Sequence, residues 1–182
     1  MALEYASIDH LFYPPLGEQT SRAGIIPYAI VEDGQPHEMW LLGTLPSGRF
    51  SDFGGGCLVT QGELPFECTI REVDEESNGL LTIPIRTALE AAFETNVEHN
   101  QPVSGLHVWR WVNLRRPEEI QYLIFLEVDY NTLASIGEEF TGNEENVSID
   151  WYEKQDLLDN YLVGNFNTSI QKFIRRFGFQ SK

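Results

Sequence analysis

Cysteine is scarce in this chain: Cys57 and Cys68 are the only two among 182 residues. They do not form a CxxC pair, so we expect neither a structural zinc site nor a disulfide framework. Proteins of reducing compartments rarely carry disulfides, and this scarcity therefore predicts a cytoplasmic location.

Long apolar runs are also missing, and none approaches the roughly 20 residues that span a bilayer. The stretch from Met1 to Pro15 has no basic segment followed by an apolar one, so we expect no secretory signal. The chain length suits one domain, which we predict over residues 1–182. Residues 1–22, with Pro14, Pro15 and Gly17, are expected to be an irregular lead-in.

Basic residues are few: 12 lysines and arginines stand against 28 acids, for a net charge of -16. Such a charge repels nucleic-acid backbones and argues against extensive nucleic-acid binding. It does not exclude a small phosphorylated ligand, because bound cations can reverse the local sign.

Apolar periodicity indicates a mixture of strands and helices. A helix is expected over Leu64–Ser77, where Phe66, Ile70 and Val73 form one apolar stripe, and another over Thr168–Phe177. Leu80–Ile85 has the composition of a strand, and Arg86–Thr95 fits either a helix or a strand. Further strands are expected at Ala23–Glu32, Met39–Gly43, His107–Asn113, Tyr122–Asp129 and Ser148–Tyr152. This order predicts the α/β (α+β) class, with a mixed sheet sandwiched between helices.

The most informative segment begins with three glycines, Gly54–Gly56, which allow close backbone approach to a ligand. On the helix that follows, Glu72, Glu75 and Glu76 have the spacing i, i+3 and i+4, so all three lie on one face. Their mutual repulsion calls for compensation, and a hard cation with oxygen ligands provides it.

Two further charged residues, Glu63 and Arg71, are eight positions apart and would pair if the loop folds back on the helix. A cluster of glutamates on a helix is more often a solvated face than a metal site. The combination of the glycines, Glu63, Arg71 and the three glutamates at fixed spacings favours the metal site.

This segment resembles the Nudix signature, which is G, five residues, E, seven residues and then REUxEExGU, where U is aliphatic. Glu63, the seven residues after it and Arg71–Ser77 match every defined position of that part. Two positions depart: six residues instead of five separate Gly56 from Glu63, and Asn78 replaces the last glycine. Asparagine also tolerates the left-handed conformation that ends a helix.

The resemblance implies a Nudix hydrolase that cleaves a diphosphate linkage with Mg²⁺ or Mn²⁺. It implies metal ligation by Glu72, Glu75, Glu76 and the carbonyl of Gly56 or Gly55. Glu76 would also belong to the catalytic group, together with Arg71 and Glu63, which would orient the other carboxylates.

Members of this family often supply a further acid from a later loop as the general base. Glu145, six positions before Trp151, fits that layout and is favoured over Glu144. Glu127, at the end of an expected strand, is a third candidate. The alternative is that the acidic loop is only a solvated surface.

The expected partner is a small diphosphate compound, derived from a nucleotide, and a homodimer is compatible with the sequence. One alternative function is removal of a nucleotide cap from RNA, which the net charge disfavours. Another is a Nudix-fold binding or sensor module without turnover, which the presence of all three helix glutamates disfavours.

Overall fold

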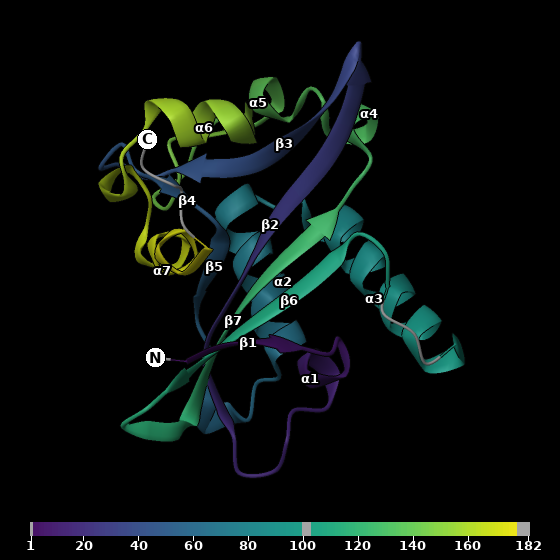
Figure 1. Cartoon of the computed structure of the whole chain (residues 1–182), viewed down its shortest axis with the longest axis vertical. Coiled ribbons are helices and arrows are strands. Elements are labelled where there is room, and N and C mark those ends of the chain that lie inside the picture. Colours follow the sequence, from purple (N-terminus) through teal and green to yellow (C-terminus); the bar gives the residue numbers. More distant parts are fainter. Residues whose placement is uncertain (1, 100–102, 178–182) are drawn as a thin grey trace. The chain divides into compact units, whose positions relative to one another are not determined.

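The computed structural model describes residues 2–99 and 103–177, which are drawn as the coloured ribbon in Figure 1. The chain divides into two compact units. The first consists of Met1–Ile25 and Phe53–Leu126, and the second of Ile26–Asp52 and Glu127–Lys182. Met1 and residues 100–102 and 178–182 of the predicted single domain lie outside the described residues.

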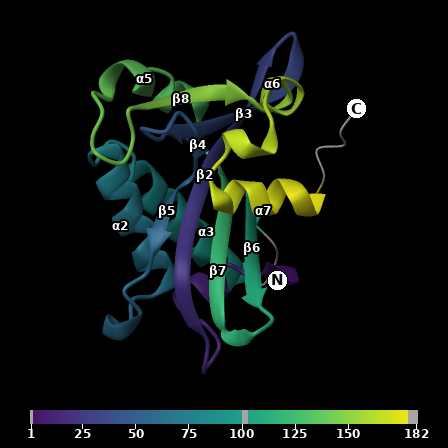
Figure 2. The ribbon, with the colours of Figure 1, turned by 90° about the vertical axis from the view of Figure 1, so that its left-hand side faces the viewer.

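The first unit contains a sheet and three helices. Its strands pair in the order β1-β6-β7-β2, and β5 also pairs with β2. Figure 2 shows β2, β7 and β6 side by side. The strands are β1 (Ala2–Ala6), β2 (Gln19–Asp33), β5 (Phe53–Gly56), β6 (Leu106–Asn113) and β7 (Arg116–Glu127), of which β2 and β7 continue into the second unit. The helical segments are α1 (Asp9–Phe12), η1 (Val59–Gln61), α2 (Pro65–Ser77) and α3 (Thr82–His99).

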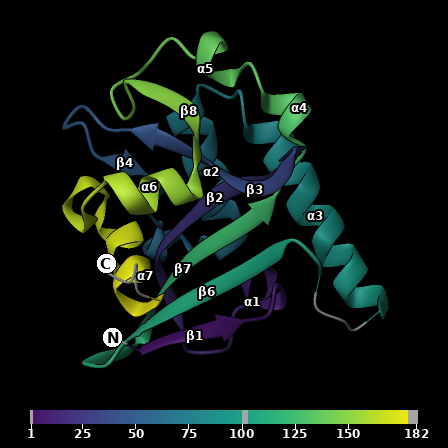
Figure 3. The same cartoon turned by 45° about the horizontal axis from the view of Figure 1, so that its top comes forward.

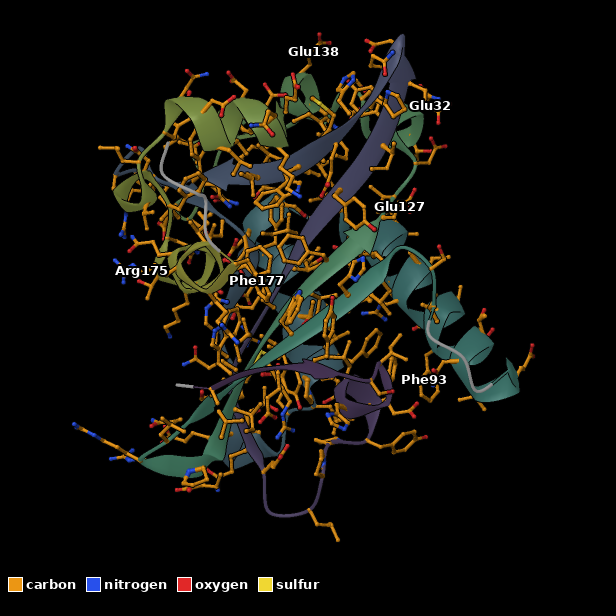
Figure 4. The ribbon with its side chains drawn as sticks, viewed as in Figure 1. Glu32, Phe93, Glu127, Glu138, Arg175 and Phe177 are labelled. Carbon is orange, nitrogen blue, oxygen red and sulfur yellow. A yellow bond between two sulfur atoms is a disulfide. The ribbon has the colours of Figure 1, made fainter. Side chains whose placement is uncertain are left out.

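The expected irregular lead-in, residues 1–22, contains regular structure. Strand β1 pairs antiparallel with β6, and Tyr5 lies opposite Trp109 with ring centroids 3.8 Å apart. Phe12 of α1 stacks on Phe93 of α3, which Figure 4 labels beside this helical turn. Aromatic contacts with distant parts of the chain therefore order this segment, although its prolines and glycine favour loops.

Helix α2 forms where the apolar stripe predicts it. Pro65 occupies its first turn, where a missing N–H costs nothing, and Glu67 accepts a hydrogen bond from the backbone N–H of Leu64 at 2.9 Å. Asn78 ends the helix in the left-handed conformation, with φ of 53°. This is the conformation that the sequence predicts for the asparagine in the place of glycine.

Helix α3 corrects the strand expected at Leu80–Ile85. The helix begins at Thr82 and continues to His99, so it also includes the ambiguous stretch Arg86–Thr95. Pro84 lies in its first turn, where proline is compatible with a helix. The strand was predicted because the isoleucines on both sides of Pro84 are β-branched, and β-branched residues are enriched in strands.

The second unit pairs β2 with β3, while β4 and β8 both pair with β3 (Figure 3). In the register of β3 and β8, Leu41 lies opposite Trp151. Trp40 is buried and lies edge-on to Phe173 of α7, with ring centroids 6.5 Å apart. The elements of this unit are β3 (Gln35–Thr44), β4 (Phe50–Ser51), α4 (Tyr130–Leu133), α5 (Ile136–Glu139), β8 (Ser148–Glu153), α6 (Lys154–Asn160), η2 (Val163–Asn165) and α7 (Thr168–Phe177).

The predicted fold class is confirmed: a mixed sheet is flanked by helices. Strands β2 and β3 are antiparallel, whereas β2 and β7 run in the same direction (Figure 1). Apart from Leu80–Ile85, the predicted strands are all present and all longer than predicted, although the one predicted at Tyr122–Asp129 begins earlier, at Arg116, and also ends earlier, at Glu127. Among the described residues, no helix is long and apolar enough to cross a membrane.

Candidate active site

The glycine run of β5 is the first component of the site, and it lies directly against β2. The two strands are antiparallel, with Gly54 opposite Gly24 and Gly55 opposite Ala23. A Cβ atom at position 54 would collide with the Cα of Gly24 and the carbonyl oxygen of Ala23. Glycine at position 54 therefore allows the two backbones to approach this closely.

Arg71 of α2 is the centre of the polar network beside this run. Its Nε donates to Glu63 Oε1 at 2.8 Å and its Nη1 to Glu72 Oε1 at 2.7 Å. Nη1 also lies 3.4 Å from Glu75 Oε2, and Nη2 donates to the carbonyl oxygen of Gly56 at 2.8 Å. The predicted pair of Glu63 and Arg71 is present, and one guanidinium holds three carboxylates and the glycine loop together.

The charges of this network shift the pKa values of its members. The hydrogen bond from Arg71 is the main cause that lowers the pKa of Glu63, with a smaller contribution from the backbone N–H of Leu58. The same bond is the main cause that raises the pKa of Arg71. Glu72 differs, because desolvation by burial raises its pKa despite its own hydrogen bond to Arg71.

The three helix glutamates differ in exposure. The side chain of Glu75 is 55% exposed, that of Glu72 only 12%, and Glu76 is buried. The Glu72 carboxylate occupies the space that a Cβ of Gly55 would fill. Oε1 of Glu76 accepts a hydrogen bond from the backbone N–H of Gly54 at 3.3 Å. Two largely buried carboxylates thus lie against the glycine run.

Carboxylate oxygens are ligands that a hard divalent cation prefers. Burial disfavours the ionised form of Glu72, and Glu75 increases that penalty through its own charge. A cation bound by carboxylate oxygens would remove it. The carbonyl oxygen of Gly56 already accepts a hydrogen bond from Arg71. The sequence suggests the carbonyl of Gly55 as the alternative ligand, and Gly55 is the residue against which the Glu72 carboxylate packs.

The two cysteines form a disulfide, which corrects the expectation from their scarcity. The bond joins Cys57, directly after the glycine run, to Cys68 in α2, with Cα atoms 5.3 Å apart. Their sulfurs and a Glu63 oxygen lie within 4.8 Å of one another. The pairing could not be read from the spacing, because it depends on how the loop returns to the helix. The cytoplasmic location, inferred from unpaired cysteines, stays a prediction.

Arg22 is a site residue that the sequence analysis did not identify. Its Nη2 donates to the carbonyl oxygen of Gly54 at 3.2 Å, and its charge lowers the pKa of Glu72 as the smallest of several contributions. Its position in β2 is far from the signature in sequence, and no local pattern distinguishes it from other strand arginines.

The three candidate bases belong to the second unit. Glu144 and Glu145 are exposed and lie in a turn in which Asn143 Oδ1 accepts from the backbone N–H of Glu145 at 2.9 Å. Val147, two residues after Glu145, donates its N–H to the carbonyl of Thr44 in β3 at 2.8 Å. The acidic loop is therefore a hydrogen-bonded turn attached to the sheet of this unit.

Glu127, the third candidate, is the exposed last residue of β7 (Figure 4). Its charge acts on the phenol of Tyr28. Burial, and then the charge of Glu127, raise the pKa of that phenol to about 12. The tyrosine therefore stays neutral and cannot compensate the carboxylate.

A cavity of about 500 Å³ lies along α2 and α3 and includes Arg71 in its lining. Phe66 and Ile70 provide an apolar wall, and Arg86 a second guanidinium. Both of its acids have protein partners, since Glu67 caps α2 and Asp74 Oδ1 accepts from Thr82 Oγ1 at 2.7 Å.

No protein-family model and no curated protein matches the sequence. Among solved structures, the chain is similar to a MutT/Nudix family protein from Listeria innocua, with a TM-score of 0.49, 13% identity and coverage of 87% of this chain and 90% of that chain. A Nudix hydrolase from M. smegmatis gives a TM-score of 0.43 at 12% identity, covering 88% of this chain and 86% of that chain. The corresponding values for a C. elegans Ap4A hydrolase are 0.42 and 15%, with 86% and 94% covered. Any assignment to the Nudix family therefore depends on the signature residues and their geometry.

Proposed function

We propose that this chain is a Nudix hydrolase that cleaves diphosphate linkages with the help of divalent metal, and that both units belong to one functional domain. The observation that supports this most directly is the network of Arg71. It gathers Glu63, Glu72 and Glu75 beside the glycine run, which agrees with the orienting role that the resemblance implies for Arg71 and Glu63. A solvated row of glutamates would not need an arginine that bonds back to the loop.

In this proposal Glu72, Glu75 and Glu76 hold Mg²⁺ or Mn²⁺, together with the carbonyl of Gly56 or Gly55. When bound, the metal neutralises charge on the phosphates and activates a water for attack on phosphorus. The side chains of Arg71 and Glu63 do not need to touch the substrate, because their task is to orient the carboxylates.

Removal of the proton from the attacking water needs a base that is not occupied by metal. We assign this role to Glu145, and Glu144 and Glu127 are the alternatives. The Asn143 side chain and the β3 strand hold the turn that carries Glu145, so its backbone has a defined conformation within the second unit.

The substrate class that fits best is a small diphosphate compound containing a nucleoside. The net charge of -16 disfavours a long polyanion such as RNA, whose backbone would be repelled outside the metal-binding site. A cytoplasmic location is part of the same proposal, and a homodimer is compatible with it.

The test is a screen of nucleoside diphosphate derivatives, dinucleoside polyphosphates and capped RNA with Mg²⁺ or Mn²⁺, scored by released phosphate or nucleotide. We expect turnover that disappears in excess EDTA and falls by about two orders of magnitude or more in Glu76→Gln. Glutamine retains an oxygen for the Gly54 N–H but removes the charge.

Glu90→Gln, an exposed change on α3, is the matched control and should retain full activity. Undiminished cleavage in EDTA would overturn the proposal. So would full activity of a correctly folded Glu76→Gln variant. Selective cleavage of capped RNA would replace the small-molecule substrate by the cap.

A further inference from the structure

The disulfide between Cys57 and Cys68 has no role in the proposed chemistry, yet it lies within the network that organises the site. Cys57 directly follows Gly56, and its N–H donates to the carbonyl of Ser21 in β2 at 3.1 Å. Cys68 is fully buried in α2, one turn before Arg71 and Glu72. The bond therefore joins the end of the glycine run to the helix that carries the glutamates.

The surroundings of Cys68 connect the bond to specific site groups. Its Sγ lies 3.9 Å from Nη2 of Arg71 and 3.9 Å from the carbonyl oxygen of Gly55. The same Nη2 donates to the carbonyl of Gly56. The sulfur bridge and the arginine thus hold the glycine run against α2 from the same side.

Little else holds the loop that the bond closes. Residues 58–62 are all exposed, and their own backbone hydrogen bonds run within residues 57–63. Apart from the disulfide, the pair of Glu63 and Arg71 attaches this loop to the helix through side chains. Without buried apolar side chains, such a loop gains many conformations when a covalent closure is removed.

We propose that the Cys57–Cys68 pair is a redox site that sets the activity of the adjoining metal-binding carboxylates. This inference rests on the proposed function. In the oxidised protein the loop of residues 57–63 keeps Glu63 on Arg71, and the site is competent. In the reduced protein this loop moves away from α2, Arg71 loses its contact with Glu63, and metal affinity and turnover both fall.

The chemical step is thiol–disulfide exchange with a dithiol reductant. A thiolate of the reductant attacks one protein sulfur and releases the other, which takes up a proton. The second reductant thiol then attacks the mixed disulfide and releases the first cysteine as a thiol. Two electrons and two protons pass to Cys57 and Cys68, and the reductant becomes a disulfide.

The experiment compares the full chain in three states: oxidised, reduced with dithiothreitol that is then removed without air, and reoxidised with diamide. Thiol titration after denaturation should give no thiols, two thiols and no thiols. We expect reduction to weaken Mn²⁺ binding, measured by electron paramagnetic resonance, by roughly tenfold or more, and reoxidation to restore it. Hydrogen exchange at residues 57–63 should rise in the reduced state, and turnover should follow the metal affinity.

Cys57→Ser and Cys57→Ser/Cys68→Ala remove the bond without reductant. Both variants should resemble the reduced protein and should not respond to dithiothreitol or diamide. Because Cys68 is buried, the single variant keeps the test valid if the double variant fails to fold.

Equal Mn²⁺ affinity and equal exchange at residues 57–63 in the oxidised and reduced chain would overturn the inference, even if turnover is abolished by EDTA as the proposed function requires. Conversely, a redox-dependent Mn²⁺ affinity without hydrolysis of any diphosphate would support the redox site and contradict the proposed function. A reduced protein that turns over faster than the oxidised one would reverse the assigned direction and overturn the inference.

Discussion

The guanidinium of Arg71 donates two hydrogen bonds to the carboxylate of Glu63, from Nε to Oε1 at 2.8 Å and from Nη2 to Oε2 at 3.2 Å. This two-point contact fixes the plane of the guanidinium, and the remaining Nη1 is thereby directed to Glu72. The orientation of one carboxylate of the candidate metal site is therefore set by a residue outside the helix.

Arg71→Lys should reduce activity although it retains the positive charge. Lysine cannot reproduce the planar two-point contact, so Glu63 and Glu72 lose their common orientation. We expect a loss of roughly 10–100-fold in turnover or metal affinity, as is usual for groups that orient metal ligands. Steady-state kinetics over a series of Mg²⁺ concentrations measure it.

The control for this change is Arg115→Lys, at an exposed turn away from the signature, which should have no effect. A double-mutant cycle with Glu63→Gln should show that the two losses are not additive, because they remove the same contact. Additive losses would contradict the coupled role of this pair.

Gly55→Ala should impair the site while the fold survives. The new Cβ would lie 2.6 Å from Cδ of Glu72, and the carboxylate would have to move. Because that carboxylate ends a flexible side chain, the movement costs little stability but displaces a proposed ligand. We expect at least a roughly tenfold loss of turnover.

Thermal denaturation should show little change for the same variant. Gly164→Ala, where no atom lies within 4 Å of the added Cβ, is the control and should be fully active. Full activity of Gly55→Ala would mean that the observed position of Glu72 is not required for turnover.

Glu145→Gln should lower turnover without changing metal affinity, since a general base contributes roughly 10²–10⁴-fold and does not need to touch the metal. Glu144→Gln should have a much smaller effect. Rates at saturating Mg²⁺ for these variants and Glu127→Gln identify the base. A large loss in Glu127→Gln alone would transfer the role to the end of β7.

Metal-free protein should lose stability as the pH rises past the ordinary carboxyl value. Burial raises the pKa of Glu72 in the folded protein above 4.5. The contribution of Glu72 to the free energy of unfolding is therefore fully present below its pKa in the unfolded chain, and it is lost as the pH rises through its pKa in the folded protein. The pKa of Glu63 is lowered in the folded protein, so its contribution to the free energy of unfolding is constant above pH 4.5 and is lost only at lower pH. Urea denaturation between about pH 4.5 and about pH 7 should show the decrease in the wild type. Its persistence in Glu72→Gln would assign it to another group.

The sequence predicted the parts of the fold that depend on local periodicity. Helix α2 follows from its apolar stripe and from Pro65, and the left-handed Asn78 from its place after the glutamates. The pair of Glu63 and Arg71 was predicted from two opposite charges eight positions apart, on the condition that the loop folds back on the helix. The catalytic roles of these residues stay predictions until variants are measured.

The parts that depend on distant contacts could not be predicted. Strand β1 exists because Tyr5 meets Trp109 of β6, a partner more than half the chain away. The disulfide depends on how the irregular loop after Cys57 returns to Cys68 in α2, which no periodic pattern indicates. At α3, local composition was misleading, because tertiary packing overrides the strand preference of isoleucine.

The contact of β5 with β2 has a practical consequence for finding relatives of this protein. Because a Cβ at position 54 would collide with the Cα of the facing Gly24, we expect glycine at position 54 wherever these two strands lie this close together. A sequence pattern that requires both a glycine in β2 and the glycine run of β5 should therefore find distant relatives. The Nudix signature alone would miss such relatives where, as here, six residues instead of five separate the glycine from the glutamate.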